Sequence, residues 1–128
     1  MATTTGAARA VGKVLPHLQG KLDGLAMRVP VPDGSIVDLA CRLGKKASCK
    51  DINAAVQEAA KGPMQRVVEY SEVPLVSSDM IGNTHSSIFD ALSTNSQEDG
   101  YARIVSWYDN EWGYSNRVVD LIGMLGAI

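Results

Sequence analysis

The sequence predicts an α+β fold, in which an antiparallel or mixed sheet carries helices packed on one face. Segments with helical and strand-like spacing of apolar residues follow one another in the order α, β, β, α, β, β, β, α. Loops of hairpin length join many of the strand segments, as is typical of antiparallel pairing. No Gly-x-Gly-x-x-Gly motif lies between a strand and a helix and no P-loop is present, so the chain by itself shows no dinucleotide site.

Length, charge and cysteine content restrict the class of protein. The 128 residues are enough for one domain with a hydrophobic core, and we predict a single domain over residues 1–128. A net charge of -2 without a basic stripe argues against nucleic acid as a partner. No apolar run of about 18 residues and no signal peptide is present, so no membrane partner is predicted. Cys41 and Cys49 have neither a metal-ligand spacing nor a disulfide framework, which indicates a reducing, cytoplasmic setting and no metal site.

The first predicted helix covers residues 7–18. Small and aliphatic residues recur there at helical spacing, Pro16 weakens it, and Gly20 is placed to end it. A threonine just before such a helix is a natural N-cap. The Thr5 hydroxyl and the Gly6 N–H have an alternative use, because a small residue at a helix N-terminus lets an anion approach the backbone. The sequence alone favours the cap.

Two strands are predicted over residues 22–30 and 35–43. A turn with prolines and an Asp-Gly pair joins them, and we expect them to pair as antiparallel neighbours. In the first strand, Arg28 shares a face with the small residues Gly24 and Ala26. An arginine there is either a charge at the edge of the sheet or a planar donor directed at a phosphate or carboxylate.

The middle of the chain combines one capped helix with short strands. Ser48 followed by Asp51 is a capping-box variant, and it predicts a helix that ends at Gly62-Pro63. The expected buried stripe of this helix is Ile52, Ala55, Val56, Ala59 and Ala60. Further strands are predicted at residues 67–70, after residues 73–76 and at residues 86–92, with a turn at 81–83 and a polar loop at 93–100.

A polar, aromatic turn connects the last predicted strand, residues 101–108, to the last predicted helix, residues 113–125. The turn brings the amides and acids of residues 109–117 to a helix N-terminus, where free N–H groups and the helix dipole favour ligands. The alternative is a strand-to-helix corner with two caps, and the local chemistry does not separate the two interpretations. The apolar face of the helix is Tyr114, Val118, Val119, Leu121, Ile122 and Leu125.

Five blocks of sequence stand in a fixed order along the chain. They are TGAARAVGKV from Thr5, MRVPVP from Met27, VSSD from Val76, THSSIFDA from Thr84, and VSWYDNEWGYSNRVVDL from Val105. In this order and at this spacing, from about Thr4 to the end of the chain, they resemble the carboxy-terminal part of the catalytic domain of the phosphorylating glyceraldehyde-3-phosphate dehydrogenase family.

The resemblance implies an oxidoreductase of glycolysis. Members of the family use NAD or NADP and inorganic phosphate to convert glyceraldehyde 3-phosphate to 1,3-bisphosphoglycerate, and they are usually tetramers. By position, Thr5 and Gly6 resemble the contacts to inorganic phosphate, and Arg28 resembles the arginine between the two phosphate sites. Asn110 resembles the residue that binds the nicotinamide carboxamide, and Tyr114 the aromatic residue that lines the ring.

Other parts of the family pattern do not occur in this sequence. The family's nucleophile lies in a Ser-Cys-Thr-Thr-Asn block, which neither cysteine matches, and neither His17 nor His85 matches the general base. We therefore predict no catalytic residue, and we interpret the chain as a fragment or a truncated product that lacks the amino-terminal NAD-binding domain. The alternative is a non-catalytic module that binds itself or a partner, because the truncation would leave apolar faces of the last helix and the sheet uncovered.

Overall fold

The computed structural model describes residues 1–127, which form two compact units. The first unit is Met1–Val31, and the second begins at Pro32. Within the described residues there are three α-helices, a two-stranded sheet and a five-stranded sheet with parallel and antiparallel neighbours. This arrangement confirms the predicted α+β class with a mixed sheet.

The first unit is a two-stranded ribbon followed by a helix. β1 (Ala2–Thr4) pairs antiparallel with β2 (Leu25–Met27), and α1 (Ala7–Val14) follows β1. The predicted helix over residues 7–18 is split, because a proline without an N–H begins the short 3-10 helix η1 (Pro16–Leu18). Gly20 then turns the chain with a φ of 74°, a left-handed conformation that glycine adopts without strain.

The predicted pairing of residues 22–30 with residues 35–43 is wrong. β2 pairs with β1, and β3 (Ser35–Arg42) pairs with β7 (Tyr101–Tyr108). Two prolines lie in the connection after β2, and proline cannot donate to a strand ladder, so the pairing does not continue across the turn as it would in a hairpin. Sequence reasoning also missed β1, because a strand of three residues is too short to show an alternating pattern.

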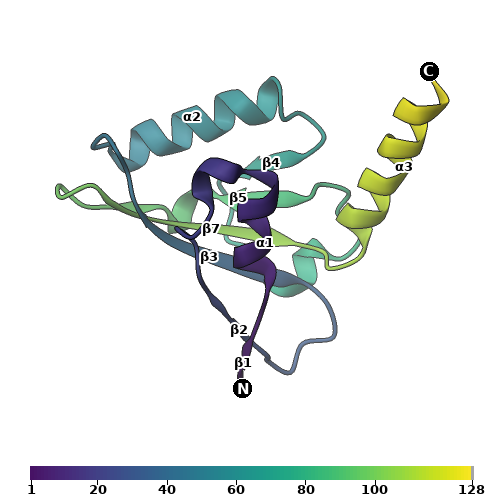
Figure 1. The fold of residues 1–128 in the computed structure, drawn as a ribbon, viewed down its shortest axis with the longest axis horizontal. Helices are drawn as coiled ribbons and strands as arrows, with labels where there is room; N and C mark the ends of the chain where they lie inside the picture. The colour runs from purple at the N-terminus through teal and green to yellow at the C-terminus, as the bar shows by residue number, and fades with distance from the viewer. Residues whose placement is uncertain (128) are drawn as a thin grey trace. The chain divides into compact units, whose positions relative to one another are not determined.

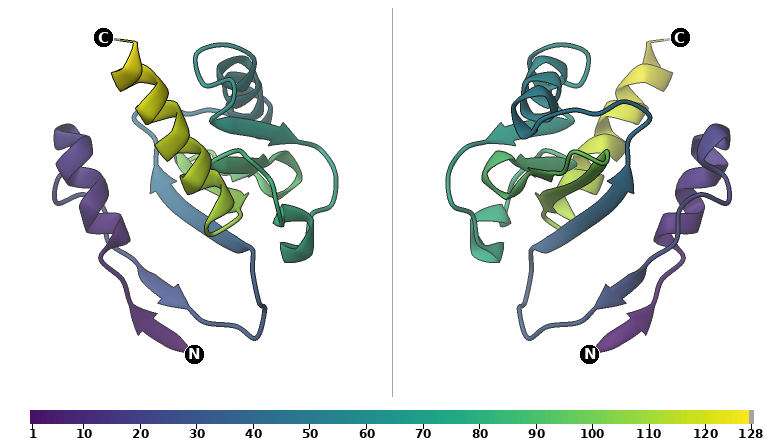
Figure 2. Two further views of the ribbon diagram at one scale, coloured as in Figure 1. Left: turned by 90° about the vertical axis from the view of Figure 1, so that its right-hand side faces the viewer. Right: turned by 90° about the vertical axis from the view of Figure 1, so that its left-hand side faces the viewer.

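The second unit is built on the five-stranded sheet, in which β7 pairs with three neighbours (Figures 1 and 2). β7 has the predicted bounds and pairs with β3 along all eight residues of both strands. On its other side lies β5 (Ser87–Asp90), which pairs in parallel with β4 (Val68–Ser71). A two-residue strand, β6 (Asn95–Ser96), also pairs with β7, inside the predicted polar loop.

The hydrophobic core of the second unit gathers around β5 and β7. Phe89 of β5 stacks on Tyr70 of β4, with ring centres 5.9 Å apart. Met80 and Ile88 are the largest side chains that are fully buried. The buried apolar residues are Met80, Ile88, Phe89, Ala91, Ala102 and Val105.

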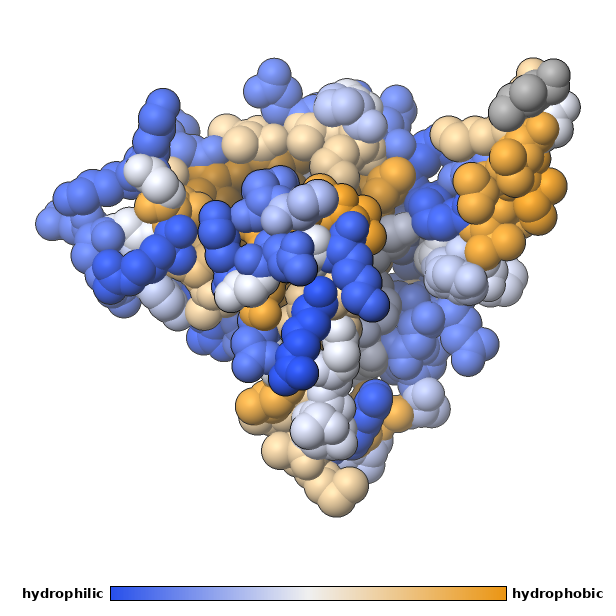
Figure 3. Space-filling view, viewed as in Figure 1, coloured by the Kyte–Doolittle hydropathy of each residue, from blue (hydrophilic) through white to orange (hydrophobic). Residues whose placement is uncertain are grey.

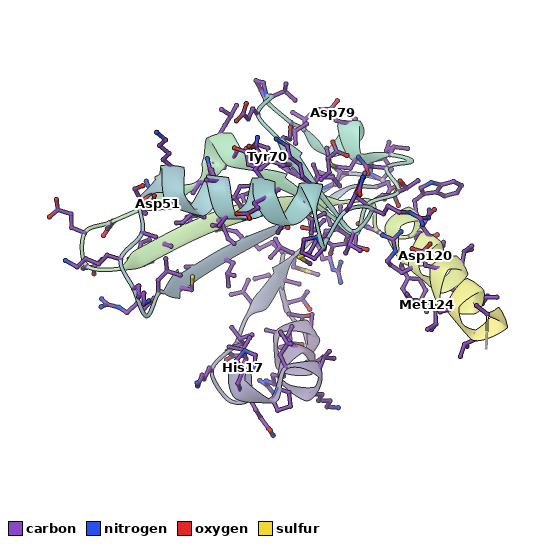
Figure 4. All side chains as sticks on the ribbon, turned by 90° about the horizontal axis from the view of Figure 1, so that it is seen from above. His17, Asp51, Tyr70, Asp79, Asp120 and Met124 are labelled. Atoms are coloured by element: carbon purple, nitrogen blue, oxygen red, sulfur yellow. The ribbon has the colours of Figure 1, made fainter. Side chains whose placement is uncertain are left out.

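The helix α2 (Cys49–Lys61) packs against β4 and begins at the predicted capping box (Figure 1). The Asp51 N–H donates to Ser48 Oγ at 3.2 Å, and the Asp51 carboxylate accepts from the Ser48 N–H at 2.9 Å. Figure 4 shows Asp51 at this end of the helix. Of the five residues expected in its buried stripe, Ala55 is exposed and the other four are half-buried.

Two further strand predictions need correction. No strand follows residues 73–76; instead the 3-10 helix η2 (Ser77–Met80) forms, and the Asp79 carboxylate accepts from the Val76 N–H at 2.8 Å. The strand predicted at residues 86–92 ends at Asp90, because the Asp90 carboxylate accepts from two N–H groups of the 3-10 helix η3 (Ala91–Ser93). In both places a local side-chain acceptor competes with strand pairing.

The last helix, α3 (Trp112–Gly126), is attached to the sheet by a very close backbone contact. Gly113 is buried, and a Cβ atom built on it would lie 2.6 Å from the carbonyl oxygen of His85. Only glycine allows the first turn of α3 to approach the segment before β5 this closely.

A polar cluster also holds α3. Arg117 donates from Nη1 to the Arg66 carbonyl at 2.6 Å and from Nε to the Asp120 carboxylate at 2.9 Å. Arg66 donates to the other oxygen of Asp120 at 3.2 Å, and Asp120 is labelled on α3 in Figure 4. The Arg66 backbone has a left-handed conformation, with a φ of 73°. The bond from the Arg117 guanidinium to the Arg66 carbonyl oxygen stabilises this conformation.

The predicted apolar face of α3 does not pack on the sheet. Within residues 1–127 it lies on the surface, and Figure 3 shows hydrophobic side chains gathered over this helix. The attached residues Gly113, Arg117 and Asp120 lie on another side of the helix, since they recur at spacings of three and four. The exposed fractions are 71% for Tyr114, 36% for Val118, 66% for Val119, 56% for Leu121, 63% for Ile122 and 63% for Leu125.

Replacing Gly113 by alanine will destabilise the second unit. The new methyl group must displace the His85 carbonyl or move α3, and we expect Gly113→Ala to lower the free energy of unfolding by about 1–3 kcal/mol. Urea denaturation followed by circular dichroism measures this change.

Gly123 provides the matched control in the same helix. A Cβ atom at Gly123 meets nothing within 4 Å. Gly123→Ala should therefore raise stability by up to about 1 kcal/mol, because alanine is the better helix former. Equal effects of the two substitutions would contradict the close packing of Gly113.

Candidate functional site

The predicted phosphate contacts Thr5 and Gly6 lie where β1 passes into α1. Gly6 is the N-cap residue and has no side chain with which to cap the helix. The predicted threonine N-cap is therefore wrong, although the Thr5 hydroxyl, one residue earlier, still accepts from the Ala7 N–H at 3.2 Å. An anion could still approach the remaining N–H groups of this first turn, because Gly6 presents no side chain.

Arg28 lies on the same face of the two-stranded ribbon as Thr5. Arg28 and Met1 exchange two backbone hydrogen bonds, of 2.8 and 2.6 Å, and Thr3 lies opposite Ala26. Opposed residues of an antiparallel pair share a face, and side chains alternate along each strand. Arg28, Ala26 and Thr3 therefore occupy one face, and continued alternation places Thr5 on it as well.

The first turn of α1 lies over this face. A Cβ atom at Gly24 would lie 3.5 Å from the Cβ atom of Ala8, and Gly24 precedes Ala26 by two positions. At about 3.3 Å per residue, the positions of Arg28 and Thr5 are about 13 Å apart along the ribbon. Arg28 is exposed and no ion pair is found for it within residues 1–127. The face thus carries an unpaired guanidinium at one end and a helix N-terminus at the other.

Asn110 and Tyr114 lie in the second unit, at the corner between β7 and α3. The residue that builds this corner is Asp109, which is buried at 5% exposure. Its Oδ1 atom accepts from the N–H groups of Glu111 at 2.9 Å and Trp112 at 2.7 Å, which caps the start of α3.

A third N–H group reaches Asp109 from a distant part of the sequence. The Gly82 N–H donates to Oδ2 of Asp109 at 2.9 Å. Gly82 belongs to the predicted turn at residues 81–83, where it has a φ of 79°. The Asp109 carboxylate therefore joins this turn to the corner before α3.

Asn110 is exposed, and within residues 1–127 its carboxamide has no hydrogen-bond partner, in contrast to the neighbouring Asp109. Tyr114 follows on the first turn of α3 with 71% of its surface exposed. The corner thus presents a carboxamide with free donors and acceptors, and an exposed aromatic ring follows in the first turn of α3.

An open hollow of about 510 Å³ lies beside the corner. It is formed by the turn containing Gly82, the corner residues and the segment that leads into β3. Its lining residues are Pro32, Asp33, Ile81, Gly82, Asp109, Asn110, Glu111 and Trp112. Of the two predicted nicotinamide contacts, Asn110 is among these lining residues and Tyr114 is not.

Hydrogen bonds lower the pKa of the Asp109 carboxyl. The bond from the Trp112 N–H contributes most, followed by that from the Gly82 N–H, and burial opposes them. Three N–H donors stabilise the ionised form more than the loss of water destabilises it. The buried carboxylate is therefore the charged form of the side chain at neutral pH.

The remaining candidate residues have structural contacts. His85 Nδ1 lies 3.0 Å from Asn83 Oδ1 and 3.1 Å from Glu69 Oε2. Cys41 is half-buried in β3, and Cys49 Sγ lies 3.4 Å from a serine hydroxyl. Within residues 1–127 no cluster of three or more His, Cys, Asp or Glu side chains is placed to hold a metal ion, and no helix is long and apolar enough to cross a membrane.

Comparison with known proteins gives the family. The model of the glyceraldehyde 3-phosphate dehydrogenase C-terminal domain matches residues 1–110 of the chain. The chain belongs to the glyceraldehyde 3-phosphate dehydrogenase family. The glyceraldehyde-3-phosphate dehydrogenase of Mycolicibacterium smegmatis is 55% identical over 124 residues, which cover 97% of this chain and 36% of the relative. That of Schistosoma mansoni is 60% identical over 119 residues, which cover 93% of this chain and 35% of the relative.

The chain spans about a third of the length of these glyceraldehyde-3-phosphate dehydrogenases. Drosophila melanogaster glyceraldehyde-3-phosphate dehydrogenase 2 shows the same relation, with 56% identity over 119 residues, 93% of this chain and 36% of the relative. The resemblance seen in the sequence blocks is therefore confirmed at the level of the family. The relatives in this family are named as dehydrogenases, which are oxidoreductases.

The corner between β7 and α3 contains a residue that sequence reasoning did not single out. Asp109 was one polar residue among several in the turn. Its position three residues before Trp112 is that of a helix-capping acid, and this spacing was the available signal. The long-range bond to Gly82 had no counterpart in the local sequence.

The lowered pKa of Asp109 predicts acid sensitivity of the second unit. A carboxyl with a lower pKa in the folded state contributes stability above its unfolded pKa of about 3.9. That contribution is lost as the pH falls through the folded pKa. We expect the urea concentration at the unfolding midpoint to decrease as the pH is lowered below about 4. In Asp109→Asn this decrease should be smaller. Glu98→Gln, at an exposed carboxyl, is the control and should leave the slope unchanged.

Proposed function

We propose that this chain forms the phosphate- and nicotinamide-contacting part of a phosphorylating glyceraldehyde-3-phosphate dehydrogenase. The reaction converts glyceraldehyde 3-phosphate and inorganic phosphate to 1,3-bisphosphoglycerate, with NAD or NADP as the cofactor, in glycolysis. The observation that best supports this function is the shared face of the ribbon, where unpaired Arg28 and the N-terminus of α1 are both available to anions. Family membership supports the reaction class.

The ribbon face suits two phosphate groups better than one. Arg28 offers planar donors to a phosphate, and Thr5 and Gly6 offer a hydroxyl and N–H groups about 13 Å further along the ribbon. On the strand of Arg28, the positions between them on this face are Ala26 and Gly24, and Thr3 lies opposite Ala26. We infer that Arg28 holds the phosphate of the substrate and extends toward the attacking inorganic phosphate, while the entry of α1 orients the latter.

The corner before α3 suits a nicotinamide ring. The free carboxamide of Asn110 has the donors and the acceptor that pair with another carboxamide, and Tyr114 offers an aromatic surface to the ring. NAD or NADP, when bound, accepts the hydride of the substrate. Asn110 would fix which face of the ring is presented, and Tyr114 would limit the access of water.

The proposed reaction needs groups from other polypeptide. The Ser-Cys-Thr-Thr-Asn block does not occur in this sequence, so a thiolate nucleophile and its base must be supplied by a further segment or chain. We propose that the function is exerted in the cytoplasm, within a homotetramer of the kind usual for the family. We infer that residues of this further polypeptide decide between NAD and NADP.

A second candidate function is a self-associating or partner-binding module. It is supported by the exposed apolar face of α3, where Leu121, Ile122 and Leu125 each leave more than half of their surface in water. We expect the purified 128-residue chain to show no NAD-dependent oxidation of glyceraldehyde 3-phosphate and to elute as an oligomer in size-exclusion chromatography. A stable monomer at high concentration would contradict the module.

The phosphate contacts can be tested in a fusion enzyme. The amino-terminal part of the Mycolicibacterium smegmatis relative, up to the start of the matched region, is joined to this chain. Arg28→Leu removes the guanidinium, and we expect kcat/KM for glyceraldehyde 3-phosphate to fall about 10²-fold, with a higher KM for phosphate.

Arg9→Leu is the matched control for Arg28→Leu. Arg9 lies in α1 of the same unit and makes only an exposed ion pair with Asp23, 3.6 Å long. It should leave both constants within about twofold of the parent enzyme. If Arg28→Leu behaved like Arg9→Leu, Arg28 would be an ordinary surface charge.

The nicotinamide contact predicts an effect of Asn110→Ala in the same fusion. Loss of the carboxamide should raise the KM for the cofactor about tenfold and reduce the facial selectivity of hydride transfer, because the ring is no longer fixed on one side. Transfer of deuterium from labelled aldehyde, followed by NMR of the nicotinamide C4 position, measures this selectivity. Unaltered cofactor affinity and selectivity would show that Asn110 has only a structural role in the corner before α3.

A further inference from the structure

The two oxygens of the Asp109 carboxylate have separate partners. Oδ1 accepts from the Glu111 and Trp112 N–H groups, which lie in the start of α3. Oδ2 accepts from the Gly82 N–H, which lies 27 residues earlier in the sequence. One oxygen therefore caps the helix, while the other holds a remote turn against the corner.

Asn110 lies between these fixed points. Its preceding residue is the buried Asp109, and the backbone N–H of its following residue, Glu111, is bound by Asp109 Oδ1. Its own carboxamide has no hydrogen-bond partner within residues 1–127, so the backbone fixes the direction of its Cα–Cβ bond and leaves the side-chain torsions free. The same carboxylate holds Gly82, which forms another part of the hollow that Asn110 lines.

A second contact ties the same segments together. The chain that leaves the turn at Gly82 reaches His85, whose carbonyl oxygen would lie 2.6 Å from a Cβ atom built on Gly113. This contact fixes the first turn of α3, which follows Asn110 in the sequence. The bond from Gly82 to Asp109 joins the turn at Gly82 to the corner that precedes Asn110. Next to the lining residue Asp33, Gly34 makes a separate close contact, since a Cβ atom built on it would collide with the Ser77 carbonyl oxygen.

From this geometry we propose that Asp109 is a positioning residue for nicotinamide binding, acting through the bond between its Oδ2 atom and the Gly82 N–H. The proposal rests on the proposed role of Asn110. The bond holds the turn at Gly82 against the corner, and it thereby fixes the Cα position and the Cα–Cβ direction of Asn110, from which the carboxamide reaches the cofactor. A carboxylate is needed because both oxygens must accept hydrogen bonds, whereas an asparagine offers only one acceptor atom.

Asp109→Asn separates the two tasks of the carboxylate. The amide oxygen can replace Oδ1 and still cap α3, but its NH₂ group faces the Gly82 N–H and cannot accept from it. In the 128-residue chain we expect hydrogen exchange at the Gly82 amide to accelerate at least tenfold, while the Glu111 and Trp112 amides keep their protection. Equal protection of Gly82 in both proteins would overturn the proposal.

In the fusion enzyme, Asp109→Asn should reproduce part of the effect of Asn110→Ala. We expect the cofactor KM to rise about three- to tenfold and the facial selectivity of deuterium transfer to fall, with kcat/KM for phosphate changed less than twofold. Asp79→Asn is the matched control, because Asp79 also accepts a backbone N–H, at 2.8 Å, but caps η2 and does not line the hollow. It should leave the KM and the selectivity as in the parent.

The outcomes separate this proposal from the proposed function. If Asn110→Ala changes selectivity and Asp109→Asn does not, the positioning role is overturned and the nicotinamide contact stands. If neither changes it, the nicotinamide contact itself is overturned. Should Asp109→Asn fail to fold, an ester in place of the Gly82 amide, introduced by chemical ligation, removes the N–H donor alone. A parent-like cofactor KM and selectivity in that ester variant would likewise overturn the positioning role.

Discussion

The second unit depends on the backbone pairing of β7. This strand pairs with β3 along its whole length and with β5 on its other side, and it contributes Ala102 and Val105 to the core. Because β7 is held on both edges, the point at which it ends is fixed in space. The corner with Asp109 and Asn110 begins at that point, so the position of the candidate nicotinamide contact follows from the sheet.

Polar groups, more than apolar packing, attach the loops and α3 to the sheet. The buried core of the second unit is small, and α3 is joined to it by a glycine contact and by the cluster of Arg66, Arg117 and Asp120. Asp109 and Asp90 each bind several N–H groups at the end of a strand. Such groups bond in only a few geometries, so they give a precise arrangement of loops where hydrophobic packing alone would leave several.

Sequence reasoning succeeded where one local signal dominated. Strand β7 has a full alternating pattern, α2 has a capping box, and both appear as predicted. It failed where distant residues decide the structure: the partner of β2 depends on β1, which is too short to be recognised. At the corner, the spacing of Asp109 before Trp112 is a local capping signal, but the bond from Gly82, 27 residues earlier, cannot be predicted from the local sequence.

Because α3 is attached through its first half, the two halves of the helix differ in local stability. Gly113, Arg117 and Asp120 fix its first half, whereas the side chains of Met124 and Leu125 are mostly in water. Local opening of a helix costs little free energy where few buried contacts must break. The turns beyond Asp120 will therefore unfold and refold locally. This fraying will stop at the polar cluster of Arg66, Arg117 and Asp120, so that the corner before α3 keeps its structure.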